Sequence, residues 1–187
     1  MKKDINELLK EKDKEIEYYK KEIDRLKDLV EYYKRESCTD SLTNLDNRRS
    51  IEDKEGFDVV ILGDIDYFKR INDTYGHDLG DQVLIEISNI LRQNIRNSDL
   101  VCRWGGEEFV ILLKNCKIED AYEKAMILKD SVESLKDEFG FKVTMSFGVS
   151  DMTNKTMKKA IKEADEAMYN SKENGRNRVT VYELKRE

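Results

Sequence analysis

The stretch LVCRWGGEEFVILL, residues 100–113, contains two strand-like runs on either side of a pair of glycines. Leu100 to Trp104 and Glu108 to Leu113 are rich in apolar and β-branched residues, and Gly105-Gly106-Glu107 separates them. Two such runs joined by a short connection that contains glycine predict a β-hairpin. Part of the sheet is therefore expected to be antiparallel, with the Glu107 carboxylate at the turn.

Further strands and helices are expected on both sides of this hairpin. FDVVILGD, residues 57–64, predicts a buried strand that ends on a carboxylate. The other expected elements are helices over residues 47–52, 78–96, 119–138 and 155–173 and strands over residues 142–149 and 179–182. This βαββαβ order predicts an α+β domain of the ferredoxin-like kind, with its helices on one face of a central antiparallel sheet.

The first 37 residues differ in composition from the rest of the chain. They contain eleven basic and eleven acidic residues, so the net charge of −6 belongs entirely to residues 38–187. Their apolar residues recur with alternating spacings of four and three, the period of a left-handed coiled coil. The seam positions are Ile5, Leu9, Lys12, Ile16, Tyr19, Ile23, Leu26, Val30 and Tyr33. We expect a dimerising coiled coil over residues 1–37 and a domain over residues 38–187; a solitary solvated helix is the alternative.

Composition disfavours several classes of protein. The longest apolar run, Phe109 to Leu113, is far shorter than the roughly 20 residues that span a bilayer. The charged N-terminus is unlike a secretory signal, so we expect a cytoplasmic protein without membrane insertion. Cys38, Cys102 and Cys116 are too far apart to indicate a disulfide framework or a zinc site. The acidic balance also argues against nucleic-acid binding.

Carboxylates lie where the expected strands end. Asp64 ends the buried strand, and Glu107 and Glu108 lie at the hairpin turn. If the two strands are neighbours, these side chains converge, and Mg²⁺ is usually held by one or two carboxylates together with substrate phosphates. Such a site would support phosphoryl transfer, with metal ions activating the attacking oxygen and stabilising the leaving one. Solvated or salt-bridged acidic side chains are the alternative.

Glycines and cations in the same motifs suit a phosphorylated substrate. Gly105 and Gly106 would let the backbone approach phosphates closely, although a plain hairpin turn also uses glycine. Lys69, Lys172 and Arg176 could supply positive charge to those phosphates. Lysines on helices are more often simply solvated.

Residues around a Gly76-His77 turn could recognise a base. Asn72 and Asp81 flank this turn. A carboxylate can accept hydrogen bonds from guanine N1–H and N2–H₂, an edge that adenine does not present, so guanine is favoured. His77 is the one histidine, and a histidine in a turn is more often a structural hydrogen-bonding residue than a catalytic base.

Five ordered segments resemble the GGDEF-domain diguanylate cyclases over roughly residues 38 to 183. The segments are DSLTNLDNRR (40–49), DIDYFKRINDTYGHDLGD (64–81), RNSDLVCRWGGEEF (96–109), SFGVS (146–150) and ADEAMYNSKENGRN (164–177). GGEEF stands in place of GGDEF and keeps the carboxylate. Only 14 residues separate Arg49 from Asp64, so we expect the first helix of the domain to be shortened.

The resemblance implies that two GTP molecules condense to cyclic di-GMP and two pyrophosphates, with one GTP held by each of two facing domains. By the family pattern, Asp64, Glu107 and the backbone carbonyl of Ile65 bind Mg²⁺, or Mn²⁺ in its place, and Glu108 assists. Glu107 also helps to deprotonate the attacking 3′-hydroxyl, and Lys69 stabilises charge in the transition state. The positions that the resemblance assigns to substrate binding are Asn72, His77, Asp81, Gly105, Gly106, Lys172 and Arg176.

Arg96 and Asp99 match an RxxD motif at which the family binds its product and is inhibited by it. An arginine fork can donate to guanine O6 and N7, and a carboxylate can accept from the opposite edge of the base. An inconsequential surface salt bridge is the alternative.

Four functions are compatible with these features. The first is an active, Mg²⁺-dependent diguanylate cyclase paired through its coiled coil, and the second is an idle domain that only senses cyclic di-GMP. The third is a cyclase that joins GTP to ATP, and the fourth is a structural adaptor. Asp64 and Lys69 argue against an idle domain, Asp81 favours guanine, and an adaptor explains residues 1–37 alone. We therefore expect an active diguanylate cyclase.

Overall fold

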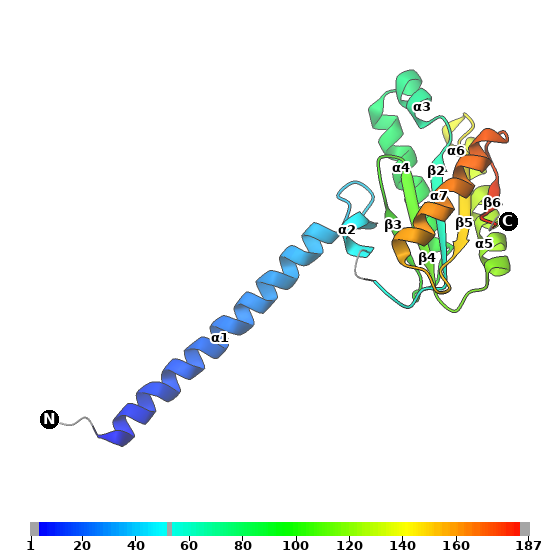
Figure 1. Ribbon diagram of the computed structural model, residues 1–187. Helices are drawn as coiled ribbons and strands as arrows, with labels where there is room; N and C mark the ends of the chain where they lie inside the picture. Colours follow the sequence, from blue (N-terminus) through cyan, green and yellow to red (C-terminus); the bar gives the residue numbers. More distant parts are fainter. Residues whose placement is uncertain (1–3, 52–53, 184–187) are drawn as a thin grey trace. The chain divides into compact units, whose positions relative to one another are not determined.

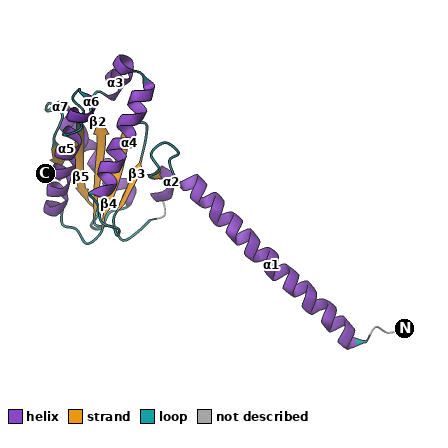
Figure 2. Cartoon of the chain, turned by 180° about the vertical axis from the view of Figure 1, so that it is seen from behind, coloured by secondary structure: helices purple, strands orange, loops and turns teal. Residues whose placement is uncertain are grey.

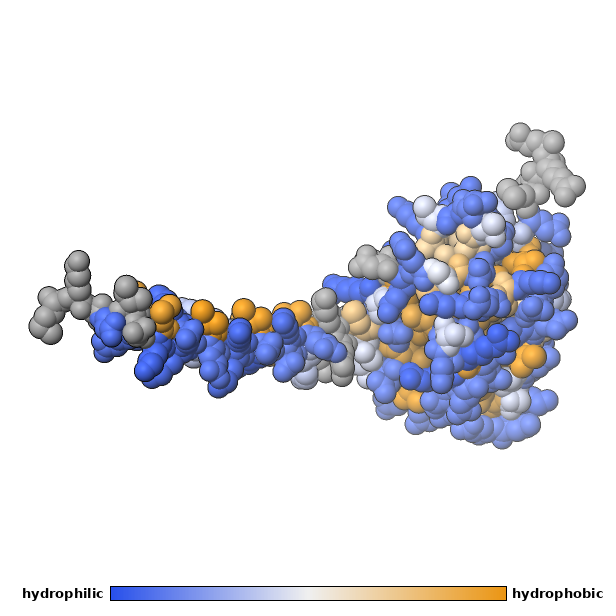
Figure 3. Space-filling view, turned by 90° about the horizontal axis from the view of Figure 1, so that it is seen from below, coloured by the Kyte–Doolittle hydropathy of each residue, from blue (hydrophilic) through white to orange (hydrophobic). Residues whose placement is uncertain are grey.

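The computed structural model describes residues 4–51 and 54–183 and consists of two compact units, residues 1–38 and 39–187 (Figure 1). The first unit is the single helix α1 (Ile5–Cys38), which confirms the expected long N-terminal helix. Apolar side chains gather along one side of α1 (Figure 3), and Ile16, Ile23 and Leu26 are each about half exposed. Among the described residues, no helix combines the length and the apolarity needed to cross a membrane.

The second unit is built on a sheet whose described strands run in the order β1-β3-β4-β2-β5-β6. Its strands are β1 (Asp46–Asn47), β2 (Val59–Ile65), β3 (Leu100–Arg103), β4 (Glu108–Leu113), β5 (Met145–Asp151) and β6 (Val179–Val181). Its helices are α2 (Arg48–Ile51), α3 (Phe68–Tyr75), α4 (His77–Gln93), α5 (Ile118–Glu133), α6 (Lys136–Phe139) and α7 (Met157–Glu173). β2 is antiparallel to both β4 and β5, and β3 is antiparallel to β4, so the predicted α+β fold with a central antiparallel sheet is confirmed.

Helices cover both faces of the sheet, so the expectation of helices on one face is wrong. Val59 and Ile61 pack with residues of α4 and α5, whereas Val60 and Leu62 pack with residues of α7. Figures 1 and 2, seen from opposite sides, show α7 in front of the sheet in one and α4 in front in the other. The physical reason is that β2 is buried along its whole length, which requires a cover on each face.

Several element boundaries also differ from the expectation. The helix expected over residues 119–138 is divided into α5 and α6, and α4 ends at Gln93, where the side chain of Asn94 donates to the Ile90 carbonyl at 2.9 Å. β5 begins at Met145 rather than Lys142, whose ammonium pairs with Glu133 at 3.0 Å. The last residue of the helix expected over 47–52 lies outside the described residues.

Gly148 in β5 lets α7 lie unusually close to the sheet. A Cβ atom at this position would be 2.0 Å from the Ala164 carbonyl oxygen and 2.3 Å from the Met168 nitrogen. Both of these atoms belong to the backbone of α7, so neither can rotate away. The close packing sets the position of the C-terminal end of α7, which carries Lys172 and leads to Arg176.

Candidate active site

The expected carboxylates converge at one end of the sheet, because β2 and β4 are neighbours. Asp64 in β2 lies directly opposite Glu108 in β4, and the Ile65 N–H donates to the Glu107 carbonyl at 3.2 Å. Asp64 is only 5% exposed, and Lys172 Nζ lies 2.8 Å from its Oδ1. A strand end, a hairpin turn and the end of α7 therefore meet at one cluster of charges.

The cluster is electrostatically unfavourable for its own carboxylates. Burial raises the pKa of Asp64, even though the hydrogen bond and charge of Lys172 oppose the shift. Burial, followed by the charge of Asp64, also raises the pKa values of Glu107 and Glu108. Three partly desolvated anions close together are a common property of sites that receive a cation or exchange a proton.

The donor set fits a hard divalent cation that arrives with a nucleotide. Within the described parts of the chain, no three His, Cys, Asp or Glu side chains already form a metal cage. Mg²⁺ does not need such a cage, because it retains waters and takes one or two carboxylates together with substrate phosphates. Asp64, Glu107 and Glu108 offer oxygen donors of this kind, and a bound cation would relieve the repulsion that raises their pKa values.

Arg103 holds the GGEEF turn, a role that sequence reasoning missed. Its Nη2 and Nε donate to the Gly106 carbonyl at 2.7 and 3.2 Å, and its Nη1 pairs with Asp40 at 3.0 Å. Although burial opposes the effect, hydrogen bonds from Thr43 and Arg103 hold the pKa of Asp40 below its usual value. The signal that could have revealed this link is an arginine just before the turn together with an aspartate in the distant DSLTN segment.

Gly105 lets the Glu108 side chain lie close against the turn. A Cβ atom on Gly105 would lie 2.7 Å from Glu108 Oε2, whereas one on Gly106 would meet nothing within 4 Å. The first glycine therefore makes room for a site carboxylate. The second leaves the surface of the turn open.

The junction of α3 and α4 brings together the residues expected to read a base. Asn72 on α3 lies against Gly80 on α4, where a Cβ would be only 1.8 Å from Asn72 Oδ1. That oxygen is buried, and it has no hydrogen-bond partner among the described residues. Asp81 follows Gly80 and is exposed, as are His77 at the start of α4 and Lys69 on α3. The exposed Asp81 carboxylate at this junction can accept hydrogen bonds from a ligand with several N–H donors.

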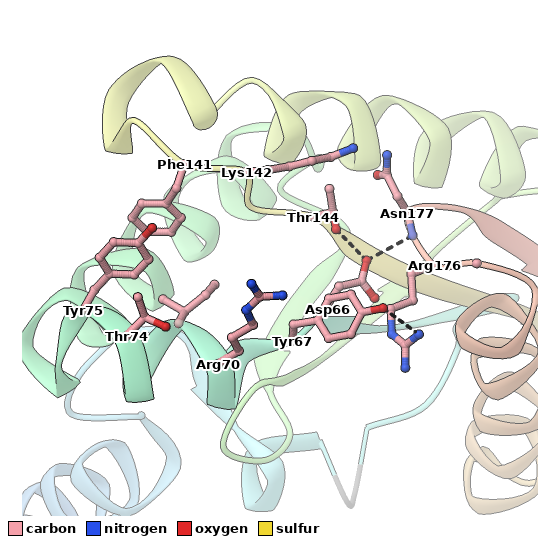
Figure 4. Close-up of a pocket in the computed structure, with 12 residues that line it drawn as sticks. Asp66, Tyr67, Arg70, Thr74, Tyr75, Phe141, Lys142, Thr144, Arg176 and Asn177 are labelled. Carbon is pink, nitrogen blue, oxygen red and sulfur yellow. Dashed lines mark hydrogen bonds between the residues drawn. The ribbon is translucent and has the colours of Figure 1, made fainter.

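The segment just after β2 contacts the segment just after α7: Asp66 binds Asn177, and Tyr67 binds Arg176 (Figure 4). The buried Asp66 carboxylate accepts hydrogen bonds from the Thr144 hydroxyl at 2.7 Å, the Ser146 hydroxyl at 2.6 Å and the Asn177 N–H at 3.0 Å. The next residue, Tyr67, lies under Arg176, whose guanidinium carbon is 4.3 Å from the ring centroid.

Tyr67 also accepts a hydrogen bond from Arg176 Nη1 at 3.1 Å. Both residues adopt left-handed backbone conformations, with φ of 58° and 63°. Non-glycine residues rarely adopt this conformation, and such strain is often found at functional sites. Sequence reasoning named Arg176 but missed Tyr67 and the structural role of Asp66, because their partners are between 78 and 111 residues away along the chain.

The RxxD segment forms a turn that Asp99 holds together. The Asp99 carboxylate accepts hydrogen bonds from the Arg96 N–H at 3.1 Å and from the Lys114 N–H at 3.2 Å. The side chain of Arg96 is exposed and has no ion-pair partner in the part of the chain that the structure describes. Arg92, Arg96 and Asp99 line a cavity of about 170 Å³.

Comparison with known proteins identifies relatives of the whole second unit. Residues 37–178 match the family described as diguanylate cyclase, GGDEF domain. Diguanylate cyclase A of Treponema denticola is 43% identical over 135 residues, which cover 70% of this chain and 36% of that protein. The response regulator PleD of Caulobacter vibrioides is 37% identical over 178 residues, which cover 86% of this chain and 39% of that protein.

Solved structures extend the similarity to the first unit. The coiled coil and GGDEF domain of DgcB from Caulobacter crescentus, in complex with c-di-GMP, has a TM-score of 0.76 at 27% identity and covers 90% of this chain and 98% of that one. The active GGEEF domain of a diguanylate cyclase from Vibrio cholerae has a TM-score of 0.64 at 33% identity and covers 68% of this chain and 83% of that one.

The chain spans little more than a third of the two named curated relatives, 36% and 39% of their lengths. The family match nevertheless covers most of this chain, and it includes every segment that carries the charge cluster, the GGEEF turn and the α3–α4 junction. The family suggested by the sequence motifs is therefore confirmed. The chain belongs to the GGDEF-domain diguanylate cyclase family.

Proposed function

We propose that this protein is a diguanylate cyclase that condenses two GTP molecules into cyclic di-GMP and two pyrophosphates. The observation that carries the proposal is the convergence of Asp64 with Glu107 and Glu108 at one end of the sheet, where Lys172 of α7 lies 2.8 Å from Asp64. An idle binding module would gain nothing from three mutually repelling carboxylates. A phosphoryl-transfer site needs such a cluster to hold cations at the phosphates.

In the proposed reaction, the 3′-oxygen of one GTP forms a bond to the α-phosphorus of the other. The bond from that phosphorus to the bridging oxygen breaks, and pyrophosphate leaves. Glu107 is the proposed acceptor of the 3′-hydroxyl proton. Lys69, Lys172 and Arg176 are proposed to balance the negative charge of the phosphates.

Asp64, Glu107 and the Ile65 carbonyl, with assistance from Glu108, are the proposed ligands for Mg²⁺, and Mn²⁺ is the alternative ion. When bound, such an ion supplies Lewis-acid stabilisation of charge on the phosphoryl oxygens. The proposed base-binding residues are Asn72 and Asp81, whose acceptor oxygens match the donors on guanine and not those on adenine. His77, Gly105 and Gly106 complete the proposed contacts to the nucleotide.

We further propose that residues 1–37 form a coiled coil that pairs two catalytic units, residues 38–187, in a homodimer. Each unit would hold one GTP, so the reaction needs two of them face to face. The support is the exposed apolar side of α1, together with the similarity to a structure described as a coiled coil with a GGDEF domain. Because the proposed substrate is GTP, we expect the protein to act in the cytoplasm.

The proposal is tested by substituting the proposed base. Glu107→Gln should reduce cyclic di-GMP formation by about 1000-fold, because it removes a proton acceptor and a charge that binds the cation. The matched control is Glu123→Gln, the same change at an exposed position on α5, which should leave turnover unchanged. Equal turnover in Glu107→Gln and the parent protein would overturn the proposal.

We also propose that cyclic di-GMP inhibits the enzyme at Arg96 and Asp99. Arg96→Ala should keep the initial rate and remove the late slowing of progress curves, because only a guanidinium exposed to solvent is lost. Asp99 is a poor test, since its carboxylate also holds the turn. Superimposable progress curves for Arg96→Ala and the parent would contradict feedback at this motif.

A further inference from the structure

A cavity of about 400 Å³ lies beside Arg176 and is also lined by Tyr67, which precedes α3, and by Arg70 on α3 (Figure 4). Its walls come from α3, the segment that leads into β5 and the loop after α7. The side chains that matter here are Asp66, Tyr67, Arg70, Lys142 and Arg176. The cavity is large enough for a small ligand and borders a residue proposed to bind substrate phosphates.

Two of the charged groups in the cavity wall already have partners within the protein. The Lys142 ammonium pairs with Glu133 at 3.0 Å, and that carboxylate also accepts a hydrogen bond from Asn177 at 2.9 Å. Hydrogen bonds from Asn177 and Lys142 lower the pKa of Glu133 to about 2. Asp66 is satisfied by its three hydrogen-bond donors.

Two guanidinium groups in the wall are not compensated. Arg70 has no ion pair or side-chain hydrogen bond to any described residue, and Figure 4 shows its side chain directed into the cavity from α3. Arg176 binds a neutral partner, Tyr67, through its ring and its hydroxyl. Two uncompensated arginines at one small cavity favour an anion that carries several acceptor oxygens, because each guanidinium can bind such a group in a bidentate manner.

The position of the cavity indicates which anion this is. Arg176 lines the cavity and lies close enough to Asp64 for its charge to act on that carboxylate, so the cavity lies near the carboxylate cluster. The rings of Tyr75 and Phe141 stack on each other, with centroids 4.3 Å apart, and close the far side. A compact phosphoanhydride fits this arrangement of cations.

We propose that the cavity is a subsite for pyrophosphate, which Arg70 and Arg176 bind together. The inference rests on the proposed function, since condensation of GTP releases pyrophosphate at the adjacent phosphates. Arg176 is shared between this subsite and the substrate phosphates, so retained pyrophosphate competes with GTP. Arg70 is the residue that distinguishes the subsite from the catalytic cluster.

The test is isothermal titration of the full-length chain with inorganic pyrophosphate in Mg²⁺ buffer without GTP. Arg70→Ala should weaken the Kd by about tenfold, because a charge-assisted contact is lost. Arg70→Lys should recover part of the loss through its charge alone. The matched control is Lys158→Ala, which removes the same charge from an exposed position on α7 and should leave the Kd unchanged. Orthophosphate should bind more weakly than pyrophosphate.

An unchanged Kd in Arg70→Ala, an equal loss in Lys158→Ala, or orthophosphate binding as tight as that of pyrophosphate would each overturn the subsite. Because no turnover is needed, the result is independent of the proposed function. A protein that binds pyrophosphate through Arg70 but makes no cyclic di-GMP would refute the function and keep the subsite. If the protein makes cyclic di-GMP but its pyrophosphate binding does not depend on Arg70, the subsite is refuted and the proposed function stands.

Discussion

Helices α1 and α7 are both amphipathic, but their apolar faces are buried to different extents. Ala160 and Ala164 of α7 are fully buried against the sheet. Ile16 and Ile23 of α1 are each 51% exposed. Helices in proteins gain most of their stability from packing of an apolar face, and isolated helices are marginal in water. The exposed apolar side of α1 therefore favours packing against a partner helix.

The difference shows how the two helices contribute to the proposed reaction. The packing of α7 is internal, and it places Lys172 at the carboxylate cluster and Arg176 on Tyr67. The packing proposed for α1 is between two copies of the chain, and it would bring together two half-sites, each of which holds one GTP. Changes in α7 should therefore act at every protein concentration, whereas changes in α1 should act through association.

Of the changes that test this comparison of α1 with α7, Gly148→Ala should have the largest effect. The new Cβ would collide with backbone atoms of α7, so the helix must move away from the sheet. Overpacking of this kind should lower the free energy of unfolding by about 1–3 kcal/mol, and the displaced Lys172 should reduce turnover at all protein concentrations. Denaturant unfolding and product assays measure both effects.

The control for Gly148→Ala is Lys162→Ala on the exposed side of α7. It should change stability by less than about 0.5 kcal/mol. A fully stable and active Gly148→Ala variant would show that α7 does not depend on this close approach.

A smaller effect that depends on concentration is expected from Ile23→Asp. A charge at a seam position should dissociate the coiled coil, so specific activity should fall roughly tenfold at low protein concentration and recover as concentration rises. Lys14→Asp, on the opposite side of the helix, is the control. If Ile23→Asp were a monomer with full activity at every dilution, the proposed role of α1 would be wrong.

The smallest effect is expected at Tyr67, which orients Arg176 at the end of α7. Tyr67→Leu should raise the KM for GTP by about three- to tenfold, because a cation–π contact contributes about 0.5–2 kcal/mol. Tyr67→Phe retains the ring and should recover most of the affinity, with kcat changed less than KM in both variants. Steady-state kinetics distinguish this positioning role from a general loss of structure, which would lower kcat equally.

Much of the sheet could be predicted because its strands are encoded locally. The run FDVVILGD and the glycine pair of GGEEF identify two strands and a turn, and the convergence of Asp64 with Glu108 then needs only that those strands be neighbours. The helices on the second face of the sheet were not predicted, although the run FDVVILGD indicates them. A strand with such a continuous apolar run is typically buried on both faces.

Contacts between distant segments were beyond prediction from one sequence. Arg103 and Asp40 are 63 residues apart, and Tyr67 and Arg176 are 109 residues apart. Such pairs depend on the order of the strands and on left-handed residues in two loops, neither of which has a periodic signature. Some element boundaries were also predicted wrongly. They coincide with individual side-chain contacts that have no periodic signature, such as those of Asn94 with Ile90 and of Glu133 with Lys142.

The most direct test of the central claim is to identify what the protein makes from an equal mixture of GTP and ATP with Mg²⁺. We expect cyclic di-GMP alone, by chromatography and mass spectrometry, because Asp81 and Asn72 favour guanine in both half-sites. A mixed GMP–AMP product would contradict the guanine selectivity. No cyclic product at high protein concentration, after removal of bound nucleotide, would contradict the proposed enzyme itself.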